Sequence, residues 1–281
     1  MRIANLRGRA VLLSADGALD IETASGSLFS SDPQALYERF AEFTAWAATA
    51  SGSAAASYDV ADLGAPVPAP RQVFAIGLNY RDHAAESNFA VPAAPVVFTK
   101  YPSCLTGPTG DVQLVPGKVD WEAELVVVIG RGGHDITVEG AWDHVAGLTI
   151  GQDLSERDLQ RSGPAPQFSL GKSFPGFGPT GPAVVSADEL GDPNDLAIGS
   201  ILNGEKVQES RTSLMIFPVA ELISRLSAVV TLYPGDLIFT GTPSGVGLGR
   251  TPQRFIEAGA ELRTFIDGLG EMRHTFLPVA R

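Results

Sequence analysis

Two glutamates stand just before an apolar run. The stretch Asp120-Trp121-Glu122-Ala123-Glu124 leads into residues 125–129, which have the composition of a buried strand. Side chains alternate between the two faces of a strand, so Glu122 and Glu124 are expected to point the same way. Two carboxylates on one buried face repel each other, and a hard divalent cation with oxygen ligands would relieve that repulsion. Taken alone, the pair is more typical of a solvent-facing strand edge.

A third carboxylate, Asp153, follows the apolar run at 145–152. Strand ends and the loops behind them commonly carry functional groups, although capping a turn or helix is the more ordinary role of a single aspartate. With Glu122 and Glu124 it would complete a three-carboxylate site. Such a site leaves octahedral positions open for water and substrate, which suits Mg²⁺.

His83 and Glu86 are three residues apart, and on a helical turn they share a face. A carboxylate beside an imidazole orients the ring and raises its basicity, which makes a pair able to activate water. The alternative is a solvated helix start, because this spacing is common. The histidines His134, His144 and His274 have no such partner and are interpreted as structural.

Two glycine-rich loops are candidates for binding an anion. A phosphate loop ending in Gly171-Lys172-Ser173 would need a glycine at the position of Pro166, so the nucleotide interpretation fails. Lys172 is expected to be a point charge near an anion, or else part of a surface turn. In the loop 240–249, backbone N–H groups and the Thr242 hydroxyl are suited to hold a carboxylate, although a plain hairpin turn fits as well.

Composition narrows the class of protein. Of 281 residues, 44% are hydrophobic and 19% charged, which is typical of a globular chain. Lys and Arg number 20 against 32 Asp and Glu, so the net charge of −12 argues against nucleic acid and anionic membranes as partners. The single cysteine, Cys104, allows no intrachain disulfide and fits a reducing compartment. The N-terminus resembles neither a signal peptide nor a membrane span, so a cytoplasmic protein is expected.

The organisation along the chain predicts two parts. Residues 1–30 have the pattern of short strands, and a helix is expected from Pro33, with Asp32 as its cap and Leu36, Phe40, Phe43 and Ala47 on its apolar face. The Ser-, Ala- and Pro-rich stretch 49–70 is interpreted as a linker. We therefore predict a small N-terminal α+β domain over 1–67 and a mainly β domain with some α over 68–281. Within the second part, 214–227 is the best candidate helix, disturbed by Pro218.

Seven segments, taken together and in order, resemble the fumarylacetoacetate hydrolase family. The resemblance covers about residues 70–281 and is much weaker before residue 67. The segments are GLNYRDHAAE (77–86), FTKYPSCLTGP (98–108), VDWEAELVVVIG (119–130), GQDLSERDLQ (151–160), GKSF (171–174), LNGEKVQESRTSLMIF (202–217) and YPGDLIFTGTPSGVG (233–247).

The resemblance implies a mixed β-sandwich roll, a homodimer and a site for Mg²⁺ or Mn²⁺. It also implies a role for each matching residue. Glu122, Glu124 and Asp153 would bind the metal; His83 and Glu86 would activate water from a mobile lid segment; Lys172 would stabilise negative charge on the substrate; Arg157, Gln160 and Thr242 would bind substrate oxygens.

The implied reaction is hydrolysis of a carbon–carbon bond in a β-diketo acid, such as an acylpyruvate or a compound like fumarylacetoacetate, through a metal-bound pyruvate-type enolate. Oxaloacetate decarboxylation and isomerisation of a 2-oxo-3-ene-dioate would use the same residues, and the dyad favours hydrolysis among the three. A metal-stabilised binding domain is the non-enzymatic alternative, but none of the ligands, the dyad or Lys172 is lost. The partner is expected to be a small anionic oxo acid whose acyl group is not specified by the motifs.

Overall fold

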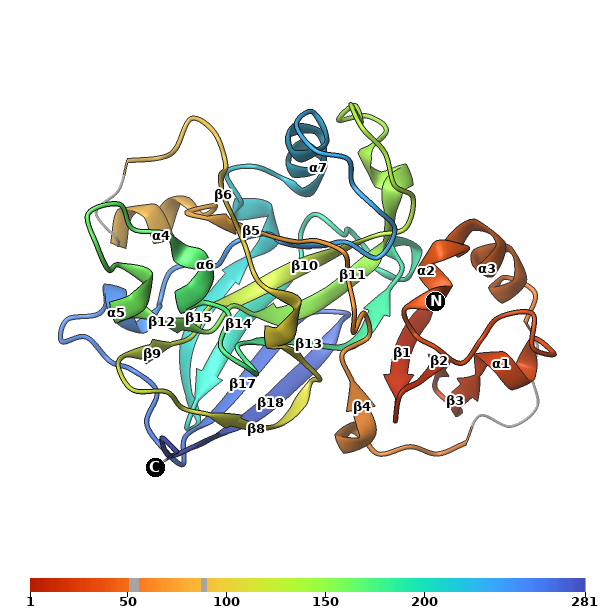
Figure 1. Cartoon of the computed structure of the whole chain (residues 1–281), viewed down its shortest axis with the longest axis horizontal. Helices are drawn as coiled ribbons and strands as arrows, with labels where there is room; N and C mark the ends of the chain where they lie inside the picture. Colours follow the sequence, from red (N-terminus) through yellow and green to blue (C-terminus); the bar gives the residue numbers. More distant parts are fainter. Residues whose placement is uncertain (51–55, 87–89, 281) are drawn as a thin grey trace.

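The fold is built on two facing β-sheets, which confirms the predicted mainly β fold with some helix (Figure 1). The computed structural model describes residues 1–50, 56–86 and 90–280. Most neighbouring strands are antiparallel, but β5 and β16, β7 and β13, and β8 and β18 pair in parallel, so the sheets are mixed, as predicted.

The larger sheet has eleven strands and carries the site. Its main path, in spatial order, is β3 (Gly17–Asp20), β2 (Arg9–Ser14), β1 (Arg2–Leu6), β13 (Gly178–Val185), β11 (Val145–Gln152), β10 (Ala123–Ile129), β16 (Leu237–Phe239), β5 (Val73–Gly77) and β6 (Val96–Thr99), with β4 (Leu63–Gly64) paired to β1 and β7 (Leu105–Thr106) paired to β13.

The second sheet has five strands and packs against the first. Its order is β15 (Glu205–Arg211), β14 (Ala197–Leu202), β17 (Glu261–Ile266), β18 (Gly270–Leu277) and β8 (Thr109–Gln113). A separate short pair joins β9 (Val119–Asp120) to β12 (Ser155–Glu156). The two layers are also joined by hydrogen bonds, because the Gln152 side chain on β11 donates to the hydroxyls of Ser200 and Thr264.

Helices are short and lie around the sheets. They are α1 (Ile21–Ala24), α2 (Ala35–Glu38), α3 (Phe40–Ala47), α4 (Arg81–Glu86), α5 (Arg157–Gln160), α6 (Phe168–Gly171) and α7 (Val219–Ser227). The 3-10 turns are η1 (Val60–Asp62), η2 (Pro102–Cys104), η3 (Ala141–His144), η4 (Ala187–Glu189), η5 (Thr212–Leu214) and η6 (Gly247–Gly249). No helix in the described ranges is long and apolar enough to cross a membrane.

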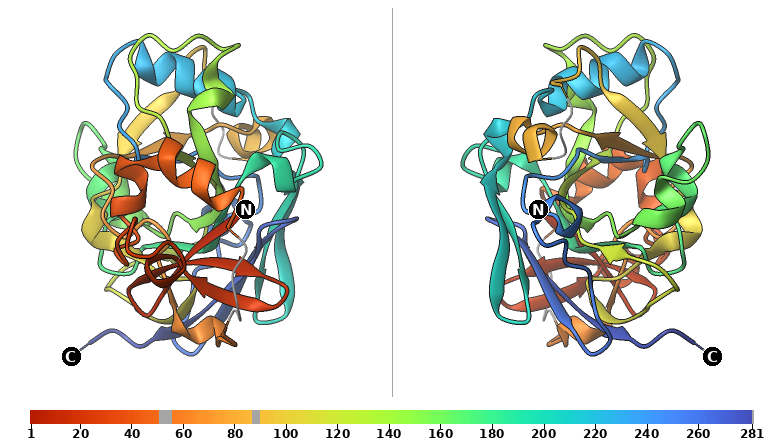
Figure 2. Two further views of the ribbon diagram at one scale, coloured as in Figure 1. Left: turned by 90° about the vertical axis from the view of Figure 1, so that its right-hand side faces the viewer. Right: turned by 90° about the vertical axis from the view of Figure 1, so that its left-hand side faces the viewer.

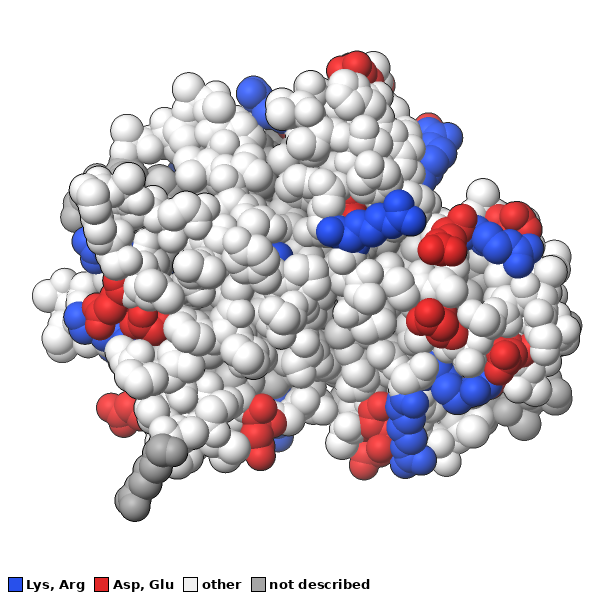
Figure 3. All heavy atoms as spheres, in the orientation of Figure 1, with Lys and Arg blue, Asp and Glu red and all other residues white. Residues whose placement is uncertain are grey.

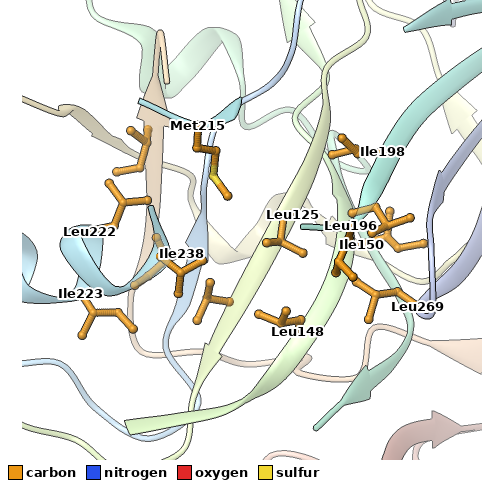
Figure 4. Close-up of a cluster of buried hydrophobic side chains, with 14 of the residues drawn as sticks. Leu125, Leu148, Ile150, Leu196, Ile198, Met215, Leu222, Ile223, Ile238 and Leu269 are labelled. Atoms are coloured by element: carbon orange, nitrogen blue, oxygen red, sulfur yellow. The ribbon is translucent and has the colours of Figure 1, made fainter. Parts of the chain in front are cut away.

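Strand β10 lies between two hydrophobic cores, which is why every one of its residues is buried. Leu125, Val127 and Ile129 belong to the core beneath α7, together with Leu148 and Ile150 of the neighbouring β11 (Figure 4). Val126 and Val128, on the opposite face, belong to a second core beneath α2 and α3. A strand covered on both faces needs a continuous apolar sequence, and this strand has one from Leu125 onwards.

The N-terminal segment is joined to the rest of the molecule by both backbone and core. Strand β1 pairs with β13, and Phe43 of α3 packs in the same core as Val126 of β10. Seen from its own end of the molecule, the segment lies against the main sheet (Figure 2, left). The domain boundary at residue 67 stays a prediction. The predicted linker lies partly outside the described residues, at 51–55, but Leu63 pairs with β1 and Val67 is buried, so this part is packed into the structure and is not a free linker.

Two predicted helices begin or end differently in the structure. The helix expected from Pro33 is two helices, because Arg39 between them leaves the helical conformation, at φ −124° and ψ 35°. Its predicted apolar face still packs into one core. The helix expected over 214–227 begins only at Val219, because Pro218 adopts an extended conformation and cannot donate within a helix.

The face drawn in Figure 3 carries most of its charged side chains in mixed groups of both signs, and no extended basic patch lies on it. Arg9 pairs with Asp20 and Arg39 pairs with Glu42, so opposite charges stand side by side on the N-terminal segment. The predicted absence of nucleic-acid and membrane partners is compatible with this face and stays a prediction.

His274 on β18 gives a test of the core in acid. Its buried Nε2 lies 3.0 Å from the Gly107 carbonyl oxygen, and burial lowers the pKa of His274 to about 4. In the unfolded chain His274 is protonated below about pH 6.5, whereas in the folded state it stays neutral down to about pH 4. This contribution to stability is complete above pH 6.5 and is lost as the pH falls through about 4, and it amounts to about 3 kcal/mol. Urea unfolding at pH 7.5 and 4.5 should show a smaller pH-dependent loss in His274→Gln.

The matched control is His134→Gln, because the His134 side chain is 47% exposed. It should keep the wild-type pH dependence. Equal pH dependence in His274→Gln and wild type would contradict the assignment of a buried, neutral His274.

Candidate active site

The register of β10 and β11 brings three carboxylates together. Glu122 precedes β10, Glu124 lies on it, and Asp153 follows β11. The antiparallel pairing continues past the strands, since the Asp153 N–H donates to the Glu122 carbonyl at 2.9 Å. One oxygen from each of the three carboxylates lies within 4.8 Å of the others. All three are buried, so the strand-edge alternative for the two glutamates is wrong.

The glycine opposite Glu124 makes room for two apolar side chains beside the cluster. Gly151 pairs directly with Glu124, and a β-carbon there would lie 2.5 Å from Val126 and 2.6 Å from Phe239. Contacts this short do not occur in real proteins, so a side chain at this position would displace Val126 or Phe239.

Three cations surround two of the three carboxylates. Lys172 Nζ lies 2.7 Å from Glu122 and 2.5 Å from Asp153, Lys100 Nζ lies 2.7 Å from the other oxygen of Asp153, and Arg157 lies 2.7 Å from Glu122. Lys172 is itself buried, so its interpretation as a surface turn is wrong.

Glu124 is the exception. Among the described residues it has no cation within ion-pair distance, and its carboxylate accepts only the Gly241 N–H, at 2.8 Å. Burial raises the pKa of Glu124 well above its usual value, and repulsion from Asp153 and Glu122 raises it further. For Glu122 burial also raises the pKa, but attraction to Lys172 and Arg157 outweighs it, so its pKa is lowered to about 2.

The donor set fits a hard divalent cation. Glu124 is 1% exposed, and an unpaired carboxylate is costly to bury. With Asp120, which pairs with Arg157, four buried carboxylates face three buried cations, so the ionised cluster carries one net negative charge. Three carboxylate oxygens close together are the ligands that Mg²⁺ and Mn²⁺ favour. Glu122, Glu124 and Asp153 would hold the ion.

The predicted dyad is present. On α4, His83 Nδ1 lies 2.7 Å from Glu86 Oε1, and the other oxygen of Glu86 accepts the Gly245 N–H at 2.9 Å. An ionised carboxylate can only accept, so Nδ1 carries the proton and Nε2 keeps its lone pair. His83 is buried rather than solvated, and the alternative of a solvated helix start is wrong.

One cavity, of about 740 Å³, connects the dyad to the acidic cluster. Seven of the nine predicted site residues line it, and Glu124 and Asp153 are absent from its lining. These seven are His83, Glu86, Glu122, Arg157, Gln160, Lys172 and Thr242. Its other walls are largely apolar, with Ile76, Val96, Phe98, Phe168, Val246 and Leu248 among them.

Three of the predicted substrate-binding groups already have protein partners. Arg157 binds Asp120 and Glu122 and donates to Gln160 Oε1 at 2.9 Å. Thr242 Oγ1 accepts from Gln208 at 2.8 Å. The structure therefore places these groups beside the cavity, and their contacts with substrate stay predictions.

Four further residues organise the site and were not predicted. Lys100 neutralises Asp153, while Asp120 binds Arg157 and accepts the N–H groups of Gly247 and Leu248 at 2.7 and 2.9 Å. Gln152 and Gln208 accept the N–H groups of Glu122 and Ala123. Asp120 was detectable in principle, because it precedes Glu122 by two residues, as Glu122 precedes Glu124. A lysine in the apolar run 96–101 was a weaker signal for Lys100.

The segment that follows Glu86 is described only in part. Ser87, Asn88 and Phe89 lie outside the described residues. Val91 is exposed and does not line the cavity.

Comparisons with known proteins agree with the motifs. The model of the fumarylacetoacetate (FAA) hydrolase C-terminal family matches residues 72–277. The mitochondrial oxaloacetate tautomerase FAHD2A of Bos taurus is 46% identical over 208 residues, which are 73% of this chain and 66% of that protein. The chain thus spans just under two thirds of the length of this relative.

Two crystal structures resemble the whole chain. A candidate HpcE protein from Mycobacterium smegmatis is 56% identical, with a TM-score of 0.96 and complete coverage of both chains. Maleylpyruvate hydrolase from Sphingobium sp. SYK-6, solved with manganese(II) and pyruvate, is 27% identical, with a TM-score of 0.80 and complete coverage of both chains.

Lys100 should be essential for the stability of the acidic cluster. Its side chain is fully buried and donates to Asp153 and to the carbonyls of Lys172 and Phe177. Lys100→Met leaves Asp153 partly unpaired and should lower the free energy of unfolding by about 3–5 kcal/mol in urea. The exposed Lys206, paired with Glu209, is the control, and Lys206→Met should cost less than about 1 kcal/mol. Similar small losses in both variants would show that Lys100 is not needed.

Proposed function

Since the chain belongs to the fumarylacetoacetate hydrolase family, we propose that it is a metal-dependent enzyme that hydrolyses a carbon–carbon bond in an acylpyruvate. One observation carries the proposal. The His83–Glu86 dyad and the carboxylate–lysine cluster line the same cavity. A base for water and a centre that stabilises negative charge are the two components that this hydrolysis requires.

A divalent cation at Glu122, Glu124 and Asp153, which we propose to be Mg²⁺ or Mn²⁺, would supply Lewis acidity towards the oxygens of an oxo acid. The buried cations Lys100 and Arg157 pair with Asp153 and Glu122 and hold them in position. With a doubly charged ion added, the net charge of the cluster becomes positive, which favours an anionic substrate.

His83 acts as the base. Its Nε2 takes a proton from a water molecule, while Glu86 holds Nδ1 and stabilises the imidazolium that forms. The resulting hydroxide attacks the distal carbonyl carbon of the substrate. The carbon–carbon bond then breaks, its electron pair remains on the pyruvate fragment as an enolate, and a proton returns to carbon to give pyruvate and a carboxylic acid.

Lys172 and the polar groups beside it serve the substrate. The ammonium of Lys172 lies where the cavity meets Glu122 and Asp153, so it is placed to stabilise the negative charge of the enolate. Arg157, Gln160 and Thr242 line the same region and are proposed to bind the carboxylate and carbonyl oxygens of the substrate.

A second candidate is proton transfer without hydrolysis. The 46% identity to an oxaloacetate tautomerase favours it. His83 would then move a proton to or from the carbon beside the carbonyl of a 2-oxo acid, and no water would be consumed. Isomerisation of an unsaturated oxo-diacid and decarboxylation of oxaloacetate need the same stabilisation of an enolate.

The location, the oligomeric state and the type of substrate are also proposals. We propose that the protein works as a cytoplasmic homodimer on a small anionic oxo acid. Size-exclusion chromatography with light scattering tests the dimer.

The experiment that tests the main proposal follows acetylpyruvate by ultraviolet absorbance in Mg²⁺, in Mn²⁺ and in EDTA. Metal-dependent loss of the diketone band, with stoichiometric pyruvate, supports hydrolysis. No loss, combined with faster keto–enol equilibration of oxaloacetate, would replace hydrolysis by tautomerisation.

Glu124→Gln should weaken metal binding and activity together, because it removes a charged ligand from the triad. We expect Mn²⁺ affinity, measured by calorimetry, to fall by about tenfold or more. The exposed Glu139 is the control, since Glu139→Gln makes the same chemical change away from the cavity. Undiminished Mn²⁺ binding in Glu124→Gln would exclude this residue as a ligand.

His83→Ala should separate metal binding from chemistry. The rate of hydrolysis should fall by about 10²-fold or more, because the base is lost. Mn²⁺ affinity should stay close to that of the wild type, and the control His134→Ala should keep both properties. Full hydrolytic activity in His83→Ala would show that another group is the base.

A further inference from the structure

Arg161 lies beside the active-site cavity, one helical turn beyond Arg157. Helix α5 carries Arg157, and Arg161 is the residue that ends it. Positions four apart share a helix face, and both arginines line the cavity. Arg157 is buried among the acidic residues, whereas Arg161 is exposed. Arg161 therefore belongs to the outer part of the same cavity.

The carboxylates that line this region all have partners. Glu86 is held by His83 and the Gly245 N–H, and Glu122 by Arg157 and Lys172. A smaller cavity of about 340 Å³ shares Arg157, Arg161, Leu248 and Gln253 with the main one, and its own carboxylate, Asp158, pairs with Lys118.

Arg161 has no such partner. Within the described ranges its guanidinium makes no ion pair, although acidic residues outnumber basic ones in the chain by 32 to 20. Most arginines on the surface do pair, as Arg211 does with Asp195 and Arg254 with Glu205. An unpaired guanidinium at a cavity mouth is free to bind an anion bidentately.

The rest of the mouth suits an anion at the end of a short apolar chain. Gln253 lines both cavities with Arg161, and its amide donates one N–H to the Leu248 carbonyl, at 3.1 Å, which leaves a second N–H. Apolar side chains, among them Phe168 and Leu248, line the main cavity together with these polar groups. A ligand that fits this cavity has a negative charge at each end and a hydrocarbon chain between the two ends.

We propose that Arg161, with Gln253, forms a subsite for the distal carboxylate of the substrate, so that the protein prefers 2-oxo dicarboxylic acids to acylpyruvates with a neutral tail. The inference rests on the proposed function, because it takes the inner end of the cavity as the site for the 2-oxo acid group. It narrows the substrate class to diacids and assigns the selection to one residue outside the acidic cluster.

Binding of two unreactive acids tests the subsite without relying on catalysis. 2-Oxoadipate and 2-oxohexanoate have the same six-carbon chain and differ only in the distal carboxylate. In calorimetry with the Mn²⁺-loaded protein, the diacid should bind about fivefold more tightly or better, and the preference should shrink with added salt. Arg161→Gln should abolish the preference and leave the affinity for 2-oxohexanoate unchanged.

Arg131→Gln is the matched control. Arg131 follows β10 at the end opposite Glu124, is exposed, and makes no ion pair in the described part of the chain. Arg131→Gln removes one positive charge, as Arg161→Gln does, but away from the cavity. The Arg131→Gln variant should therefore keep the preference for the diacid. Loss of preference in both variants would mean that net charge, and not a subsite, selects the diacid.

Two other results separate this inference from the proposed function. Equal binding of the two acids by the wild type would overturn the subsite and leave the oxo-acid site standing. Binding of neither acid to the Mn²⁺-loaded protein would overturn both.

Discussion

The repulsion among three buried carboxylates is the constraint on which the site depends. Glu122, Glu124 and Asp153 are held together by strand register, and without compensation their burial would oppose folding. Lys100 and Lys172 compensate part of this charge from within the protein, whereas Glu124 has no cation within ion-pair distance among the described residues. The fold therefore stabilises an anionic cluster that is incomplete by itself, as a metal centre open to substrate requires.

The glycine loop 240–249 connects the acidic cluster to the base. Three of its backbone N–H groups donate hydrogen bonds to carboxylates. Gly241 donates to Glu124, Gly245 to Glu86 and Gly247 to Asp120. Because one loop binds both Glu124 and the carboxylate of the dyad, a single stretch of backbone sets the distance between the two. Such preorganisation is what both hydrolysis and proton transfer need, so it does not by itself distinguish them.

Sequence patterns predicted the carboxylates of the inner site better than the residues that hold them in place. Alternation along a strand placed Glu122 and Glu124 on one face, and strand register explains why Asp153 joins them. Lys100 and Asp120 were missed because their partners are far away in the chain, and no local pattern encodes a contact between Lys100 and Asp153. The fold class followed from many short apolar runs between turns, whereas the break at Arg39 and the packing of the expected linker depend on tertiary contacts.

The cavity differs in polarity along its length, and this difference bears on function. At its inner end the charges of Glu122, Arg157 and Lys172 are buried and paired, so electrostatic interactions there act at low dielectric and are strong enough to stabilise a developing enolate. At its mouth Arg161 is exposed, and an interaction there is weaker and screened by salt. A substrate would thus gain its reactivity at the inner end and its selectivity at the mouth, where a single side chain can change without disturbing the buried cluster.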